Sequence, residues 1–164
     1  MNKTLFILIG LKGSGKTHIG SLIQRKLGIQ FFRVEDVWLE LKEEKFSEEY
    51  IRKGFSLVAE KIDEKFKEAN RLVIESTAAH QEFHNLLARL KDKYEVKLIK
   101  IMAPPDLCLK RTKTRVQSIH IPVSDDRVEV INRKAFSVNL PFDLVIENEK
   151  GTDKEIVGNF SSLL

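Results

Sequence analysis

The stretch "GLKGSGKT", residues 10–17, decides the fold, because it has the spacing G-x-x-x-x-G-K-[ST] of a phosphate-binding loop. An apolar run precedes it and an apolar stripe at helical spacing follows it, which is the strand–loop–helix context that this loop requires. The alternative interpretation is a glycine-rich turn that contains Lys-Thr by coincidence. Four matched positions arise by chance in roughly one such chain in a few hundred. The stretch therefore predicts a bound nucleotide.

The residue types of this stretch suit a triphosphate and its metal ion. Glycines give the backbone conformations closed to other residues, so that successive N–H groups converge on phosphate oxygens, and the following helix adds its positive end. Lys16 is expected to reach the β- and γ-phosphates and to act in catalysis, and the Thr17 hydroxyl is expected to bind Mg²⁺. The residues predicted to bind ATP here are Gly10, Leu11, Lys12, Gly13, Ser14, Gly15, Lys16, Thr17 and His18.

Length and composition are those of one globular domain, which we expect to span residues 1–164. Cys108 is the only cysteine, so an internal disulfide is excluded and a reducing, cytoplasmic setting is expected. No apolar run approaches the roughly 18 residues of a membrane span, so we expect no membrane partner. The net charge of +4 tolerates an anionic ligand without indicating nucleic acid.

Short apolar runs alternate with segments of helical spacing along the chain. Continuous apolar runs are typical of strands buried on both faces of a parallel sheet, and strand–helix alternation favours right-handed crossovers. The pattern predicts an α/β fold, a three-layer α/β/α sandwich with a five-stranded parallel sheet. A capping box of Thr152 and Glu155 is predicted to open the last helix. The predicted strands are Thr4–Ile9, Ile29–Arg33, Leu72–Ser76, Val96–Met102 and Asp143–Glu147.

Acidic residues follow two of the predicted strands. Glu35 and Asp36, in "FFRVEDVW", come after the second strand, where a carboxylate accepts the proton of a substrate hydroxyl that attacks a γ-phosphate. They are candidate catalytic and substrate-binding residues, and capping of a helix that starts near Val37 is the alternative. Glu75, in "LVIEST", ends the third strand. It is a candidate ligand of Mg²⁺ or of the substrate, and a buried acid paired with a lysine is the alternative.

A basic stretch, "LKRTKTRVQSIHIP" at residues 109–122, contains four cations and no acid. Arg111 and Arg115 are four residues apart, which predicts that they share one helical face. Such a pair closes over a triphosphate and stabilises the charge that develops on the transferring group, so both are candidate catalytic and ATP-binding residues. The missing acids and the downstream Pro122 favour a lid at about residues 112–124, and a solvated helix surface is the alternative.

Two further residues are weaker candidates for binding the acceptor. Arg52 lies in a predicted helix from which it would face an anionic substrate, although its neighbours are ordinary surface charges. His80 follows the third strand and would line the site. The histidines lack metal-ligand spacing with the cysteine or with each other, so no zinc site is predicted.

The motifs together resemble those of the small P-loop kinases, the group that includes shikimate, gluconate and nucleoside-monophosphate kinases and the kinase domain of polynucleotide kinases. The resemblance runs from "GLKGSGKT" through "LVIEST" and "KRTKTR" to "FDLVIEN". It implies a P-loop NTPase fold with a short arginine lid, which is also compatible with an AAA-type P-loop family, and it implies ATP and Mg²⁺ as cofactors. In those relatives the carboxylate after strand two is the general base, which corresponds here to Glu35 or Asp36. Their paired lid arginines correspond to Arg111 and Arg115.

The function that the resemblance implies is ATP-dependent transfer of the γ-phosphate to a hydroxyl of a small molecule or of a nucleotide or polynucleotide end. Two departures from shikimate kinases, Arg33 in place of an acid and "STAAH" in place of a glycine triplet, argue against shikimate as the acceptor. Two alternatives of another class stay open. The chain would then be a nucleotide-hydrolysing switch, or a nucleotide-binding module that has lost catalysis.

Overall fold

Five parallel strands form the centre of the fold in the order β2-β3-β1-β4-β5. The computed structural model describes residues 2–41, 47–115, 120–121 and 123–164. The predicted α/β class and five-stranded parallel sheet are confirmed, and the strand ends differ from the predicted ones by one residue at most. The strands are β1 Thr4–Ile9, β2 Gln30–Phe32, β3 Arg71–Ser76, β4 Glu95–Met102 and β5 Leu144–Glu147.

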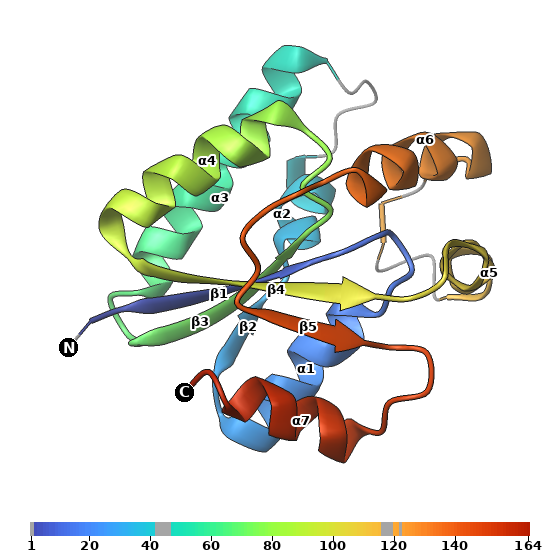
Figure 1. The fold of residues 1–164 in the computed structure, drawn as a ribbon. Coiled ribbons are helices and arrows are strands. Elements are labelled where there is room, and N and C mark those ends of the chain that lie inside the picture. Colours follow the sequence, from blue (N-terminus) through green and yellow to red (C-terminus); the bar gives the residue numbers. More distant parts are fainter. Residues whose placement is uncertain (1, 42–46, 116–119, 122) are drawn as a thin grey trace.

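Helices cover both faces of this sheet and give the three layers (Figure 1). One face carries α1 and α7, and the opposite face carries α3 and α4. The remaining helices, α5 and α6, lie beyond the carboxyl ends of the strands, and α2 follows β2 directly. Every helix in the described part of the chain is too short or too polar to cross a lipid bilayer. The helices are α1 Lys16–Leu27, α2 Val34–Leu41, α3 Glu48–Lys65, α4 Gln81–Lys93, α5 Pro105–Thr114, α6 Asp125–Phe136 and α7 Asp153–Ser161.

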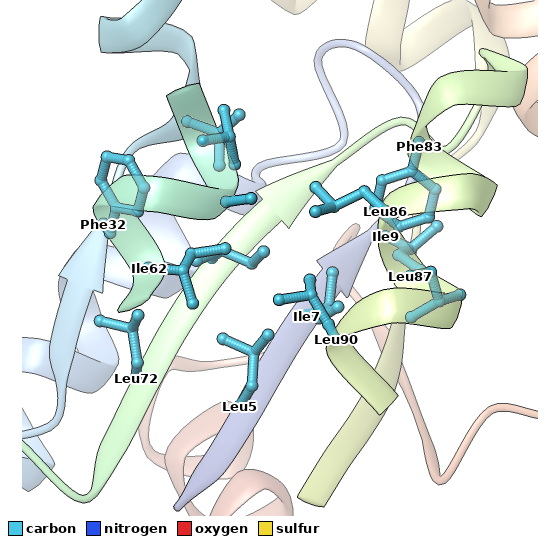
Figure 2. Close-up of a cluster of buried hydrophobic side chains, with 14 of the residues drawn as sticks. Leu5, Ile7, Ile9, Phe32, Ile62, Leu72, Phe83, Leu86, Leu87 and Leu90 are labelled. Atoms are coloured by element: carbon cyan, nitrogen blue, oxygen red, sulfur yellow. The ribbon is translucent and has the colours of Figure 1, made fainter. Parts of the chain in front are cut away.

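Alternation along β1 divides its side chains between two hydrophobic cores. Leu5, Ile7 and Ile9 pack toward α3 and α4, while Phe6 and Leu8 pack toward α1 and α7. Figure 2 shows the first core, in which strand residues meet the apolar stripes of α3 and α4. A strand buried on both faces requires the continuous apolar run from which the parallel sheet was predicted.

One helix begins where the sequence predicted, and another begins earlier than predicted. The last helix opens with the predicted capping box, in which the Thr152 hydroxyl and the Glu155 carboxylate each accept a hydrogen bond from the other residue's backbone N–H. Helix α2, in contrast, begins at Val34 and not near Val37. Glu35 and Asp36 therefore lie within its first turn, where negative charge is favourable. Because adjacent residues of a helix point in different directions, the two carboxylates can contact different groups.

Parallel pairing brings the carboxyl ends of the strands to one edge of the sheet. Ile9 of β1 pairs with Ser76 of β3, and Phe32 of β2 pairs with Ile74 of β3. The segments that follow β1, β2 and β3 therefore lie side by side, which is where open α/β sheets bind ligands.

Substitution of Leu8 by Ala tests the core. The side chain is fully buried between β1 and the helices α1 and α7, so Leu8→Ala is expected to lower the free energy of unfolding by about 2–5 kcal/mol. Urea denaturation followed by circular dichroism measures this change. Leu164→Ala is the matched control: that leucine is 45% exposed, and its loss is expected to change stability by less than about 0.5 kcal/mol. Equal losses for both variants would contradict the assignment of the core.

Candidate nucleotide and acceptor site

The predicted phosphate-binding loop connects β1 to α1 and is held in an unusual backbone conformation. Gly13 and Gly15 have φ of +84° and +97°, and Gly15 is the N-cap of α1. A Cβ at Gly13 would overlap the carbonyl of Cys108 on α5, and a Cβ at Gly15 would overlap the side-chain amide of Asn148. Glycine is therefore required at both positions by backbone conformation and by space.

Lys16 is buried, and its ammonium forms hydrogen bonds within the phosphate-binding loop. Nζ donates hydrogen bonds to the carbonyl oxygens of Gly10 at 2.9 Å and of Leu11 at 2.7 Å. Burial lowers the pKa of Lys16 to about 8, and the negative charge of Glu75 partly opposes that shift. A cation held by two carbonyls at the start of a helix is available to an anion that enters the loop.

Thr17 and Glu75 come together because β1 and β3 are neighbours. The Thr17 hydroxyl donates to Glu75 Oε2 at 2.9 Å, while Glu75 Oε1 is buried and has no hydrogen-bond partner among the described residues. Burial raises the pKa of the Glu75 carboxyl. One hydroxyl and one carboxylate, both hard oxygen donors, fit a Mg²⁺ ion that takes its other ligands from phosphate and water. Within the described ranges, no group of three or more His, Cys, Asp or Glu side chains would hold a metal ion alone.

The two acids of the first turn of α2 have different surroundings. Glu35 Oε2 accepts from Nδ1 of His120 at 2.9 Å, and Glu35 Oε1 accepts from the backbone N–H of Ile121 at 2.8 Å. Although burial opposes it, the charge of Lys12 with these hydrogen bonds holds the pKa of Glu35 below its usual value. Asp36 is half exposed and forms an ion pair with Arg33 at 3.2 Å. Only Glu35 of the pair lines the cavity described below.

The two arginines of the basic stretch both reach the site, but from different backbone conformations. Arg111 lies on α5 and donates to the carbonyl of Asn148 at 2.9 Å. Arg115 is the C-cap of α5: its backbone N–H donates to the Arg111 carbonyl one turn earlier, while its own dihedral angles are extended. Arg115 Nε is buried without a hydrogen-bond partner among the described residues. Of the predicted lid, residues 116–119 and Pro122 lie outside those described.

Two asparagines hold the loop from outside, through contacts that the sequence did not predict. Asn132 of α6 accepts from the Lys12 backbone N–H at 2.7 Å and donates to the Lys12 carbonyl at 3.2 Å. Asn148, after β5, donates to the carbonyl of Ser14 at 2.8 Å. Both contacts join residues more than a hundred positions apart, and no local spacing in the sequence signals them. His120 was missed as a partner of Glu35 for the same reason.

A cavity of about 900 Å³ lies between the phosphate-binding loop, Glu35, Glu75 and the two arginines. Its lining includes eleven of the sequence-predicted site residues, and it extends past them to α2, α3 and α6. Gly10, Leu11 and Ser14 belong to the loop but do not line the cavity, and neither do Asp36 and Arg52. The predicted residues that line it are Lys12, Gly13, Gly15, Lys16, Thr17, His18, Glu35, Glu75, His80, Arg111 and Arg115.

Two of the remaining predicted residues, His18 and His80, have ordinary structural partners, and Arg52 is exposed. His18 is exposed and lies 3.2 Å from Asp153 of α7. His80 is the N-cap of α4, where its Nδ1 accepts from the backbone N–H of Glu82 at 3.0 Å. Arg52 is exposed on α3. His80 thus combines a capping role with a place in the cavity wall.

Comparison with known proteins assigns the fold to a family. A family model described as an AAA domain matches residues 7–132, which is more than half of the chain. No curated protein matches the sequence significantly. The match covers the loop, Glu35, Glu75 and both arginines.

Solved structures of several kinases share the fold at low sequence identity. The shikimate kinase of Aquifex aeolicus is 22% identical, with a TM-score of 0.65 over 97% of this chain and 95% of that one. The APS kinase CysC of Mycobacterium tuberculosis, solved with AMPPNP and APS, is 16% identical, with a TM-score of 0.67 over 99% and 98% of the two chains. A sugar kinase of a Janibacter species is 14% identical, with a TM-score of 0.67 over 98% and 93%.

Substitution of Gly13 by Ala tests whether the loop needs the close approach to α5. Gly13→Ala is expected to lower the free energy of unfolding by at least about 1 kcal/mol more than Gly28→Ala, since overpacking adds to backbone strain. Gly28 is the matched control: its φ of +68° is also positive, but a Cβ there meets open space. Urea denaturation gives the two stabilities. Equal losses would show that contact with Cys108 imposes no constraint.

Proposed function

Because the chain belongs to the AAA domain family and its P-loop faces the same cavity as Glu35, we propose that it transfers the γ-phosphate of ATP to a hydroxyl group of an acceptor. The observation that supports the proposal is that the phosphate-binding loop and a carboxylate able to accept a proton line the same cavity. Phosphate-binding groups line one part of it, and a carboxylate with a lowered pKa lines another. The acceptor is a small molecule or a nucleotide or polynucleotide end.

The donor half of the site is built to bind and orient a triphosphate. The loop N–H groups and the N-terminus of α1 attract its oxygens, and Lys16 exchanges its two loop carbonyls for phosphate oxygens. Thr17 and Glu75 would hold Mg²⁺. When bound, that ion supplies neutralisation of the charge on the β- and γ-phosphates. His18 and Lys12 complete the lining beside the loop.

The acceptor half contains the proton acceptor. Glu35, and not Asp36, is the general base of the proposal, because only Glu35 lines the cavity and its lowered pKa keeps it ionised at neutral pH. His120 and the backbone of Ile121 fix the orientation of the carboxylate. Accepting a hydroxyl proton as the hydroxyl attacks requires such a positioned carboxylate.

The two arginines stabilise the charge that develops on the transferring group. Arg111 is tied to the loop and to Asn148, so it holds its place beside the phosphates. Arg115 has a buried Nε without a hydrogen-bond partner among the described residues, and an entering phosphate oxygen would supply one. Both side chains line the cavity, which supports a role in transfer as well as in binding.

Carboxamide substitutions of the two acids test the base. Glu35→Gln is expected to lower the rate of phosphoryl transfer to an accepted alcohol at least tenfold more than Asp36→Asn does, on the scale of about 10²–10⁴ typical of a general base. Production of ADP coupled to phosphorylated acceptor is the measurement, with Lys16→Ala as the variant expected to transfer nothing. Equal and mild effects of the two substitutions would remove Glu35 as the base.

The same assay separates the proposed kinase from two other function classes. Hydrolysis of ATP at a rate that no acceptor alters would favour a nucleotide-hydrolysing switch. Tight ATP binding without any turnover would favour a nucleotide-binding module.

The pH dependence of transfer tests the contact between His120 and Glu35. A base works only when deprotonated, so the rate falls as the pH drops through the pKa of Glu35. The hydrogen bond and charge of His120 contribute to lowering that pKa. His120→Gln is therefore expected to move the acid limb of the rate profile to higher pH.

The matched control for this shift is His84→Gln, since His84 bonds the Ala78 carbonyl and does not line the cavity. It is expected to leave the acid limb in place. An acid limb that stays unchanged in the His120 variant would mean that another group limits the rate at low pH.

A further inference from the structure

Beyond Glu35, the cavity has two apolar walls. One wall comes from α2 and α3 and presents Trp38, Ile51 and Phe55. The other comes from α6 and the residues before it and presents Val123, Val130 and Ile131. Val130 is 47% exposed, and its exposed surface lines the cavity. Apolar surface that faces an open cavity is surface that a ligand buries.

The first wall is held rigidly by its own packing. The Trp38 ring covers Gly54 so closely that a Cβ there would overlap it. Phe55 and Tyr50 meet the same ring edge-on, at centroid distances of 5.3 Å and 5.5 Å. The ring of His80 lies nearly parallel to Phe55, at 25° and 6.4 Å. These aromatic groups form a wall that is preorganised before a ligand arrives, which reduces the entropic cost of binding.

The charges around the cavity are unevenly distributed. Lys12, Lys16 and Arg115 are gathered beside the phosphate-binding loop, where Glu35 and Glu75 partly balance them. Among the described residues that line the cavity beside Trp38 and Phe55, the ionisable side chain is His80, whose Nε2 already lies 3.6 Å from Glu48.

On α6, the charged residues that reach the cavity are exposed and not buried: Asp126, Arg127 and Lys134. A carboxylate held against the two apolar walls would therefore lose its hydration without gaining a buried cation.

We propose, on the basis of the proposed function, that the acceptor is an alcohol attached to a flat, uncharged aromatic or heteroaromatic ring, as the ribose of a nucleoside is attached to its base. The ring lies between the wall of Trp38 and Phe55 and the wall of Val130, and the hydroxyl lies at Glu35. In the transfer, the acceptor oxygen forms a bond to the γ-phosphorus as the bond from that phosphorus to the ADP oxygen breaks. The hydroxyl proton passes to Glu35, and ADP leaves with the electron pair.

Fluorescence of Trp38, the only tryptophan of the chain, reports binding at this wall without requiring turnover. The protein is titrated, without ATP, with uridine, cytidine, 2-phenylethanol, shikimate and gluconate. The two nucleosides or the aromatic alcohol are expected to change the emission saturably. Shikimate and gluconate are expected to leave it unchanged. Comparison of the nucleosides with 2-phenylethanol separates a heteroaromatic ring from any aromatic ring.

Substitutions on α6 test the second wall with a matched pair. Val130→Asp is expected to weaken binding of the ring compound at least about fivefold, because a carboxylate in an apolar contact must be desolvated. Phe136→Asp adds the same charge to the same helix at a side chain that is 70% exposed and outside the cavity. It is expected to leave the dissociation constant unchanged. Both positions are exposed, so neither substitution disturbs the core.

The outcomes separate this inference from the proposed function. Binding of ring alcohols to Trp38 without transfer to any acceptor would support the ring site and overturn the kinase. Transfer to shikimate or gluconate, with no response of Trp38 to nucleosides or 2-phenylethanol, would support the kinase and overturn the ring acceptor. Equal weakening by Val130→Asp and Phe136→Asp would overturn the second wall.

Discussion

The burial of one ammonium group at the end of the central strand organises the whole site. Lys16 lies where β1 passes into α1, and two carbonyls of its own loop accept its hydrogen bonds. Desolvation makes that charge costly, which is why its pKa falls to about 8 and why a carboxylate, Glu75, lies close enough to oppose the shift. The parallel pairing of β1 with β3 provides this carboxylate. Burying this cation without a bound ligand costs free energy, and a polyanion that enters the loop offsets that cost by pairing with the ammonium.

Much of the fold follows from local sequence patterns. The continuous apolar run of β1, the glycine spacing of the loop and the capping box at Thr152 each depend on residues within one turn or one strand, and each was predicted correctly. Glu75 could be singled out because it ends an apolar run, but its contact with the loop depends on β1 and β3 being neighbours, which the alternation of strands and helices does not specify. The start of α2 could not be predicted, since Val34 is a weak helix former and nothing local distinguishes it from the end of β2.

The parts of the site that escaped prediction are long-range contacts. His120 reaches Glu35 across 85 positions, and Asn132 reaches the backbone of Lys12 across 120. Such contacts depend on the final packing of α6 and the segment before it, and an isolated histidine or asparagine carries no periodicity that reveals its partner. For the same reason the choice between Glu35 and Asp36 stayed open in the sequence, although the two carboxylates differ sharply in the fold.

The two hydrogen bonds between Asn132 and the backbone of Lys12 connect α6 to the phosphate-binding loop. The same helix carries Val130 and Ile131 of the apolar wall, so one rigid element touches both the phosphate-binding loop and the space beyond Glu35. A ligand that shifts α6 from either side therefore changes the surroundings of the other ligand. If the protein binds a donor and an acceptor as proposed, linkage makes this effect reciprocal: each ligand changes the affinity for the other by the same factor.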